Sequence, residues 1–174
     1  WWQEWVPTTF AWQNYVKVWS VVPFAQFYSN SILVSLCITF GQVTTSAMAA
    51  YAFARLSFPG RDKIFFGYLA TMMIPGAVTM IPVFILLEKL HWIDTYKALI
   101  LPGIFSAYGT FMLRQFFLTL PKDLEDAAKI DGCSYVRIFW HIVLPLSKPA
   151  LATLTTFTFM GSWMTLMWPL IAVN

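Results

Sequence analysis

Residues 124–145 read LEDAAKIDGCSYVRIFWHIVLP, and they form a polar interruption in a strongly apolar chain. This stretch contains Asp, Glu, Lys, Arg and His side chains. Residues 98–113 before it and residues 149–172 after it contain no charged side chain at all. The apolar flanks indicate the class of protein, and the polar stretch indicates which part of that protein meets water.

Composition places the chain among membrane proteins. Of its 174 residues, 59% are hydrophobic and only 11% are charged, whereas soluble domains contain about 25% charged residues. The net charge of +3 is small and scattered, which argues against nucleic-acid binding. Cys37 lies in an apolar tract and Cys133 in the polar stretch, so no disulfide is expected between them. The sequence predicts an all-α, polytopic membrane bundle.

Four stretches are apolar enough to cross about 30 Å of hydrocarbon. They are residues 31–54, 64–87, 98–118 and 149–172. The first is rich in small residues, which permit close helix contacts in lipid. The third contains Arg114, about 6 Å from its end at 1.5 Å per residue, within reach of the membrane surface.

The second stretch contains two prolines, each of which removes a helix hydrogen bond. Such breaks are tolerated at membrane depth where protein or a water-filled cavity covers the backbone. A kink here therefore either lines a transport pathway or is buried and structural. The candidate pathway residues, equally consistent with packing or lipid contact, are Pro75, Pro82, Phe84, Trp163 and Trp168.

The distribution of Lys and Arg predicts the topology. Residues 55–63 contain three, residues 88–97 contain two, and residues 114–148 contain five. By the positive-inside rule, residues 55–63 and 119–148 are cytoplasmic and residues 88–97 are outside. Residues 1–30, with ten aromatic side chains, are then an extracytoplasmic, interfacial segment. Because the chain starts without Met or a signal peptide, we expect it to be a fragment.

The polar stretch itself predicts a helical hairpin on the membrane surface. Pro121 suits a helix start, and acidic residues follow it in the first turns, where the helix dipole favours them. Gly132 suits a left-handed cap, Ser134 can cap a second helix, and Pro145 marks the return to the bilayer. Such a hairpin either docks on a partner or is a solvated loop.

The spacing within this stretch resembles a known signature. Asp126-Ala127-Ala128 is followed after three residues by Gly132, and after nine more by Ile142, one residue and Leu144-Pro145. This is similar to the E-A-A-x3-G-x9-I-x-L-P loop of ATP-binding-cassette importer permeases. The chain resembles the carbohydrate-importer branch of that family, including AAYAFARLSFPGR (49–61) and LPLSKPAL (144–151).

The resemblance implies a type-1 importer transmembrane domain that lacks its first and last spans. It further implies that residues 121–148 form a coupling loop seated in a cleft of a separate cytosolic ATPase. Asp126 is one methylene shorter than the signature Glu, and Cys133 replaces a small residue, so Glu125 is expected to share the acidic role. The implied docking residues are Glu125, Asp126, Ala127, Ala128, Asp131, Gly132, Ile142, Leu144 and Pro145.

The resemblance also implies the function and the partners. We expect a multi-pass permease subunit in a bacterial or archaeal inner membrane, with a second permease subunit, an ATPase pair and an extracytoplasmic solute-binding protein. The substrate is expected to be a sugar or oligosaccharide, with glycerol phosphate or another small solute as the alternative.

No catalytic residue, metal site or cofactor is expected on this chain. It has no G-x4-G-K-[ST] motif for ATP phosphates, so ATP is expected at the partner subunit. Two other classes of protein stay open: an ATP-independent carrier, and a membrane-embedded enzyme or structural subunit. The first would need an intramembrane ionisable relay, for which Arg114 alone is a candidate, and the second would need clustered polar residues in the spans.

Overall fold

The computed structural model of the protein describes residues 12–173, and every regular element in that range is helical. The chain divides into two compact units, Trp1–Leu33 and Val34–Asn174. The described part of the first unit holds α1 (Gln13–Val21) and the first turns of α2 (Phe24–Arg55). The rest of α2 and all later helices belong to the second unit, which contains the candidate site.

The predicted interfacial segment falls partly on residues 1–11, which lie outside the described residues. Residues 12–30 form α1, a two-residue break at Val22 and Pro23, and the start of α2. No residue of α1 is buried, and Trp12, Tyr15 and Trp19 are exposed. The predicted span 31–54 lies within α2, which begins at Phe24, seven residues before the predicted start.

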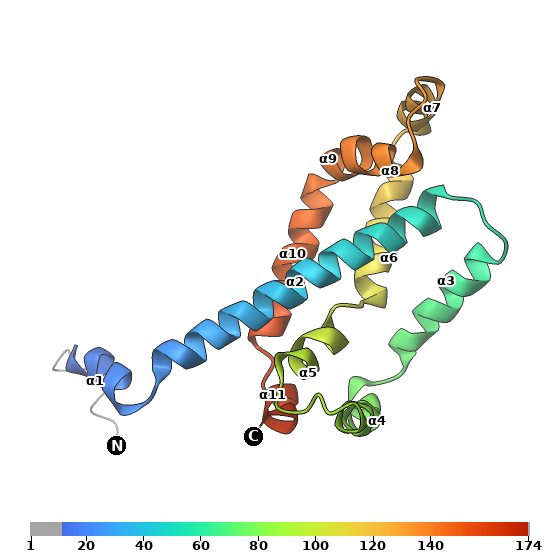
Figure 1. Ribbon diagram of the computed structural model, residues 1–174. Helices are drawn as coiled ribbons and strands as arrows, with labels where there is room; N and C mark the ends of the chain where they lie inside the picture. The colour runs from blue at the N-terminus through green and yellow to red at the C-terminus, as the bar shows by residue number, and fades with distance from the viewer. Residues whose placement is uncertain (1–11, 174) are drawn as a thin grey trace, which may run out of the picture. The chain divides into compact units, whose positions relative to one another are not determined.

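Helices of very different length make up the second unit (Figure 1). After α2 come α3 (Arg61–Ala70), η1 (Thr71–Met73), α4 (Gly76–Lys89), α5 (Tyr96–Ile100), η2 (Leu101–Gly103), α6 (Ala107–Thr119), α7 (Lys122–Ile130), α8 (Tyr135–Ile138), η3 (Phe139–Val143), α9 (Leu144–Leu146), α10 (Lys148–Trp163) and α11 (Met167–Ala172). Of these, η1 and η2 are 3-10 turns and η3 is a π-helical turn.

Only α2 is by itself long and apolar enough to cross a membrane within residues 12–173. Two bent pairs would raise the number of spans to three. Arg61–Met73 and Gly76–Lys89 meet at 100°, and Tyr135–Leu146 and Lys148–Trp163 meet at 79°. The predicted stretch 98–118 is divided between α5, η2 and α6, with Pro102 in the break, and α10 ends at Trp163, inside the predicted stretch 149–172.

The kink expected in residues 64–87 occurs at Pro75. Ile74 and Pro75 have extended ψ angles of 116° and 135°, as proline imposes on the residue before it. Pro82, by contrast, lies inside α4 without ending that helix. One of the two prolines therefore sets the direction of the chain.

Small residues on α2 allow neighbouring segments to approach its backbone, as the sequence predicts. Ser46, Ala47 and Ala50 are buried, and they face a cluster that includes Leu113 of α6 and Leu154 of α10. A Cβ atom built on Gly41 would lie 2.6 Å from Cγ2 of Ile104. Close packing in the second unit therefore depends on glycine and other small residues of α2.

A second apolar cluster joins α4, α5 and α11. Leu87, Ala98 and Ala172 are buried together there. The indole Nε1 of Trp168 donates to the Ala98 carbonyl at 3.0 Å, and the Asp94 amide donates to the Ala172 carbonyl at 3.0 Å. These two hydrogen bonds connect α11 to α5 and to the segment that precedes α5.

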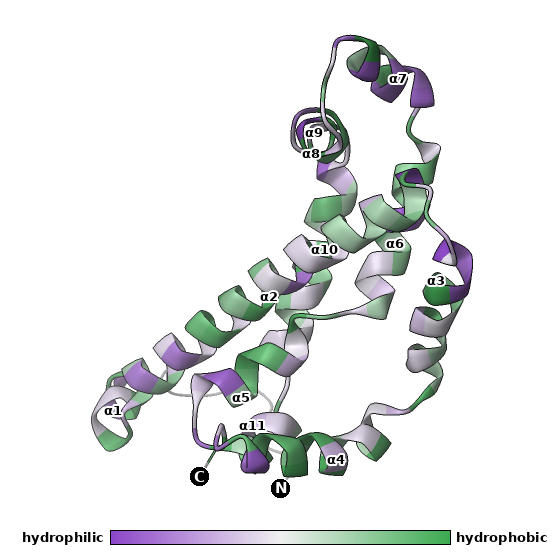
Figure 2. Ribbon diagram, turned by 45° about the vertical axis from the view of Figure 1, so that its right-hand side comes forward, coloured by the Kyte–Doolittle hydropathy of each residue, from purple (hydrophilic) through white to green (hydrophobic). Residues whose placement is uncertain are grey.

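The two clusters lie at opposite ends of the second unit. In Figures 1 and 2, α7, α8 and α9 lie at one end and α4, α5 and α11 at the other. The turn between α2 and α3 lies toward the α7 end (Figure 1). Polar residues colour α7 in Figure 2, whereas the helices between the two ends are largely apolar.

Substitution of Gly41 tests the close approach. We expect Gly41→Ala to lower the free energy of unfolding by about 1–3 kcal/mol, because the new methyl group overpacks against the stiff, β-branched Ile104. Gly161→Ala is the matched control, since no atom lies within 4 Å of its Cβ position. Denaturation in detergent, followed by tryptophan fluorescence, measures both; equal stability of the two variants would contradict the packing.

Candidate functional site

The polar stretch folds into α7 followed by a turn and a second helical segment, which we call the hairpin (residues 121–146). Pro121 precedes α7 as its N-cap, one position earlier than predicted, and Asp123 and Glu125 occupy the first turn. Gly132 has φ of 78°, and its amide donates to the Lys129 carbonyl at 3.0 Å. The Cys133 amide donates to the Ala128 carbonyl at 2.9 Å, which completes the left-handed cap that the sequence predicts.

The second half of the hairpin begins at the predicted cap. The hydroxyl of Ser134 accepts a hydrogen bond from the Arg137 amide at 3.3 Å. The helix then runs through α8, the π-helical turn η3 and α9. Pro145 lies in α9, shortly before the chain turns by 79° into α10.

One face of the hairpin, which we call the inner face, packs against the apolar cluster that contains Leu113 and Leu154. Glu125 and Ala128 are 5% and 7% exposed, and Ala128 belongs to the apolar cluster with Tyr51 and Phe117. Three further residues of the hairpin, Cys133, Ile142 and Leu144, are partly buried against the same cluster.

Glu125, for which the sequence predicts an acidic contact with a partner, is buried in this chain. Its side chain is 7% exposed and is paired inside the chain, because the first turn of α7 directs it toward α2. Ala128 is likewise turned inward. Their role as docking contacts stays a prediction.

Arg55, the last residue of α2, is the partner of Glu125. Its Nε lies 2.9 Å from Oε1 of Glu125 as an ion pair, without the alignment of a hydrogen bond. Its Nη2 donates to the carbonyl oxygens of Phe117 at 2.7 Å and Leu120 at 2.6 Å, at the end of α6. The Arg55 side chain is 2% exposed. One guanidinium therefore joins α2, α6 and α7.

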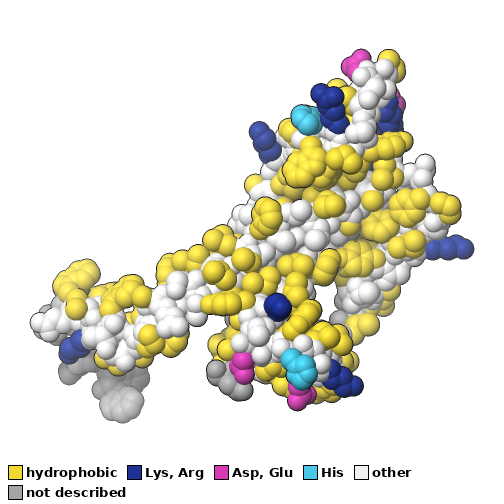
Figure 3. Space-filling view, viewed as in Figure 1, with side chains coloured by type: hydrophobic (Ala, Val, Ile, Leu, Met, Phe, Trp, Pro, Cys, Tyr) yellow, Lys and Arg dark blue, Asp and Glu magenta, His cyan; other side chains and the backbone are white. Residues whose placement is uncertain are grey.

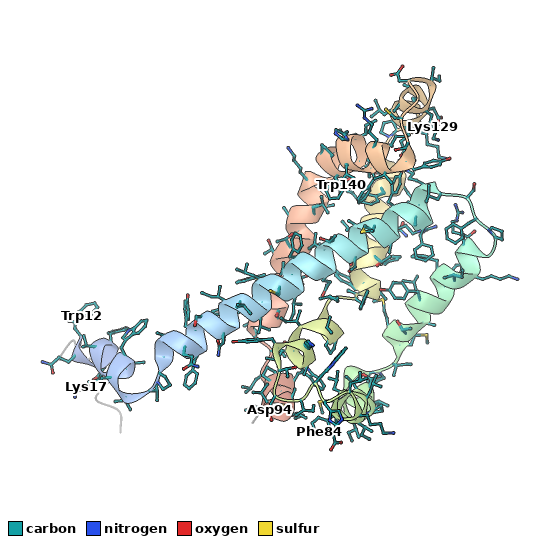
Figure 4. The ribbon with its side chains drawn as sticks, in the orientation of Figure 1. Trp12, Lys17, Phe84, Asp94, Lys129 and Trp140 are labelled. Carbon is teal, nitrogen blue, oxygen red and sulfur yellow. The ribbon has the colours of Figure 1, made fainter. Side chains whose placement is uncertain are left out.

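The outer face of the hairpin is exposed. Asp126, Ala127, Ile130 and Asp131 are exposed, and Ile130 is 87% accessible. The Asp126 carboxylate accepts a hydrogen bond from Lys129 Nζ at 3.1 Å, and this bond holds the pKa of Lys129 above its ordinary value. Charged side chains gather over this end in Figure 3, and Lys129 and Trp140 mark it in Figure 4.

A cavity of about 800 Å³ lies among α2, α4, η2, α10 and α11. Hydroxyl and amide groups line part of it, and Gln42 Nε2 donates to Thr158 Oγ1 at 3.0 Å. Its remaining lining is apolar and includes Trp168. None of the described residues that line the cavity is charged.

Of the predicted pathway residues, Trp168 lines this cavity, whereas Pro75, Pro82, Phe84 and Trp163 do not line it. Their sequence neighbours Gly76, Val83 and Ser162 do so instead. Phe84 lies on α4, at the end of the unit away from Lys129 (Figure 4).

Arg114 is half-buried and contacts two neighbouring helices. Its Nε donates to the Phe53 carbonyl at 3.2 Å, and its guanidinium lies 4.3 Å from the centre of the Phe65 ring. It is absent from the cavity lining. Arg114 thus joins α2, α3 and α6 through these two contacts.

The sequence did not reveal the roles of Arg55 and Gln42. Arg55 ends a long apolar run and was counted only as a topology signal. Its partner lies 70 positions later in the sequence. A single sequence has no local signal for such a distant pair.

An apolar bundle of long and broken helices, with a polar hairpin fixed at one end, is the architecture of a helical membrane protein. The family model described as binding-protein-dependent transport system inner membrane component matches residues 42–174. The chain belongs to this family, and the resemblance inferred from the hairpin signature is confirmed.

Individual relatives carry the names of transporters. The sn-glycerol-3-phosphate transport system permease protein UgpE of Yersinia enterocolitica is 39% identical over 175 residues, and that of Escherichia coli K12 is 37% identical. Each match covers 97% of this chain and 62% of the relative, so the chain spans less than two thirds of their length.

A solved structure shares the fold. It is a bacterial ABC transporter involved in the import of the acidic polysaccharide alginate, with a TM-score of 0.79 and 26% identity. The match covers 84% of this chain and 52% of that chain.

Removal of the Glu125 carboxylate tests the buried ion pair. We expect Glu125→Ala to lower the free energy of unfolding by about 3–5 kcal/mol, because Arg55 would remain buried without its counter-charge. Asp126→Ala, which removes an exposed carboxylate from the same helix, should change it little. Denaturant unfolding in detergent measures the free energy of unfolding of both variants. An equal decrease in the two variants would contradict the burial of Glu125.

Proposed function

We propose that the protein is a permease subunit of an ATP-binding-cassette importer and that its hairpin docks on a separate cytosolic ATPase. The main support for this proposal is that the hairpin has a buried inner face and an exposed outer face. Its inner face is fixed to α2 and α6 by burial and by Arg55. Its outer face carries exposed acidic and apolar residues at the α7 end of the unit.

The composition of the outer face supports a protein partner. Leu124, Ile130, Val136 and Trp140 are 45%, 87%, 67% and 57% exposed. Large apolar side chains exposed together among charges are typical of protein contact sites. An ATPase cleft that covers these side chains and pairs with Asp126 would bury them. The docking residues are then Asp126, Ala127, Asp131, Gly132 and the exposed apolar residues.

The remaining partners and the orientation follow from the same proposal. The hairpin and residues 55–63 face the cytoplasm, and residues 88–97 and the N-terminal segment lie outside. Only 22% of the apolar window of α2 is buried inside the chain. The uncovered surface is available to lipid and to a second permease subunit. A binding protein delivers the solute from outside, and ATP is bound and hydrolysed by the ATPase.

We propose a neutral sugar or oligosaccharide as the substrate. The cavity offers hydroxyls, an amide and the indole of Trp168, which suit a hydroxylated ligand with an apolar face. The relatives named for sn-glycerol 3-phosphate favour that anion as a second candidate. A phosphate would gain most from a cationic side chain, but Arg114 is engaged away from the cavity.

The docking proposal predicts that a charge reversal on the outer face uncouples transport. In proteoliposomes that contain the assembled transporter, we expect Asp126→Lys to reduce uptake at least about tenfold while the permease remains inserted, within the usual range of coupling factors. Asp62→Lys is the matched control, because Asp62 is 62% exposed beside Arg61 and Asp126 is 63% exposed beside Lys129. Gly132→Val should act like Asp126→Lys, because its φ of 78° disfavours a β-branched residue.

The same vesicles separate an importer from an ATP-independent carrier. With a hydrolysis-deficient ATPase partner, uptake should fall to background, whereas a carrier driven by an ion gradient would continue. Wild-type uptake by Asp126→Lys and Gly132→Val would also argue against the docking role of the hairpin.

The proposed substrate predicts a specific effect of Thr158. We expect Thr158→Val to raise the KM for sugar uptake about fivefold, because it removes a hydrogen-bonding group worth about 1 kcal/mol and frees Gln42. Thr155→Val, an exposed position of α10 outside the cavity, is the control. Uptake of glycerol phosphate in preference to a neutral oligosaccharide would show that the second candidate is correct.

A further inference from the structure

We infer that Arg55 is a positioning residue that makes the hairpin and the ends of α2 and α6 move as one body when the ATPase moves. This inference rests on the proposed function, since it concerns how docking at the hairpin reaches the helices. It goes beyond that function because it assigns the connection to one side chain and to its partner, Glu125.

The contacts of Arg55 all lie on other segments than its own. Its Nε faces Glu125 at 2.9 Å, and its Nη2 donates to Phe117 and Leu120 at 2.7 and 2.6 Å. α6 and α7 are connected by only Leu120 and Pro121. The guanidinium therefore holds both sides of this connection and ties them to the end of α2.

The charges favour this arrangement at every helix end. The carbonyl groups at a helix C-terminus attract cations, and the first turn of a helix attracts anions. Arg55 lies at the C-termini of α2 and α6, and Glu125 lies in the first turn of α7. The pair thus neutralises three helix ends at one point, away from water.

Burial is what gives the contact a mechanical role. The Arg55 and Glu125 side chains are 2% and 7% exposed. If the hairpin moved away from α2 without admitting water, each would be a buried charge without its partner, which is strongly unfavourable. An exposed pair such as Arg61 and Asp62, at 32% and 62% exposure, carries no such penalty because water replaces the partner.

Neighbouring residues of α7 then have opposite tasks. Successive residues of an α-helix point about 100° apart, and Glu125 is buried while Asp126 is exposed. A partner that contacts Asp126 on the outer face therefore moves Glu125 on the inner face. Tyr51, one turn before Arg55 on α2, has its ring centre 5.2 Å from that of Phe139, which adds an apolar contact to the second half of the hairpin.

The test compares transport with ATP hydrolysis in the assembled, reconstituted transporter. We expect Arg55→Gln and Glu125→Gln each to reduce solute imported per ATP hydrolysed by about tenfold, within the usual range of coupling factors. ATPase association, measured by co-purification, should stay as in the wild type because the outer face is unchanged. Arg61→Gln is the control, since it removes an arginine from an exposed ion pair of the same chain.

A purely structural role would give a different result. It would lower the amount of assembled transporter but leave the ratio of import to hydrolysis unchanged in the complexes that remain. If Arg55→Gln assembles poorly, the milder variant Arg55→Lys is used in its place, because it keeps a positive charge. One ammonium group replaces a guanidinium that holds a carboxylate and two carbonyls, so an intermediate ratio is expected.

The double variant decides whether the two residues act together. If they form one connection, Arg55→Gln with Glu125→Gln should uncouple no more than either change alone. The inference is overturned if the double variant loses the product of the two single losses, or if both single variants import as much solute per ATP hydrolysed as the wild type. ATP-dependent uptake by the wild type would still uphold the proposed function in either case. Wild-type uptake without ATP would instead reject the proposed function, and the inference with it.

Discussion

The rest of the structure depends on one buried ion pair, between Arg55 and Glu125. Charges leave water only at a considerable cost, so such a pair restricts the arrangements open to the chain more than it adds to stability. Here it joins the end of α2, the end of α6 and the first turn of α7. The apolar side chains around it could pack in several ways, but few of those ways would keep both charges paired.

A related constraint governs the broken helices. Breaks in a helix free backbone carbonyl groups that lipid cannot satisfy, and at two of them a side chain from a distant segment supplies the donor. Thr45 donates to Ile104 at 2.5 Å, and Trp168 donates to Ala98 at 3.0 Å. Gly41 contributes by leaving room for the irregular segment beside α2. The interruptions after α5 and around η2 are therefore supported from neighbouring helices.

The sequence predicted the features that local chemistry determines. The left-handed cap at Gly132, the cap at Ser134 and the small packing face of α2 are all present. The resemblance also identified the family correctly. Hydrophobicity located the apolar stretches but not their breaks, because it does not register how sharply the chain turns at Pro75 or near Pro102. The inward direction of Glu125 depends on Arg55, 70 positions earlier, and no local pattern contains that information.

The uncharged lining of the cavity has an energetic consequence for the proposed transport cycle. Membrane voltage does work only on charge that crosses it, about 2.3 kcal/mol per elementary charge for every 100 mV. A neutral sugar, held by neutral groups, moves no charge through the field. An electrical gradient would then neither drive nor oppose its entry, and accumulation against a concentration difference would draw wholly on chemical energy released in the aqueous phase.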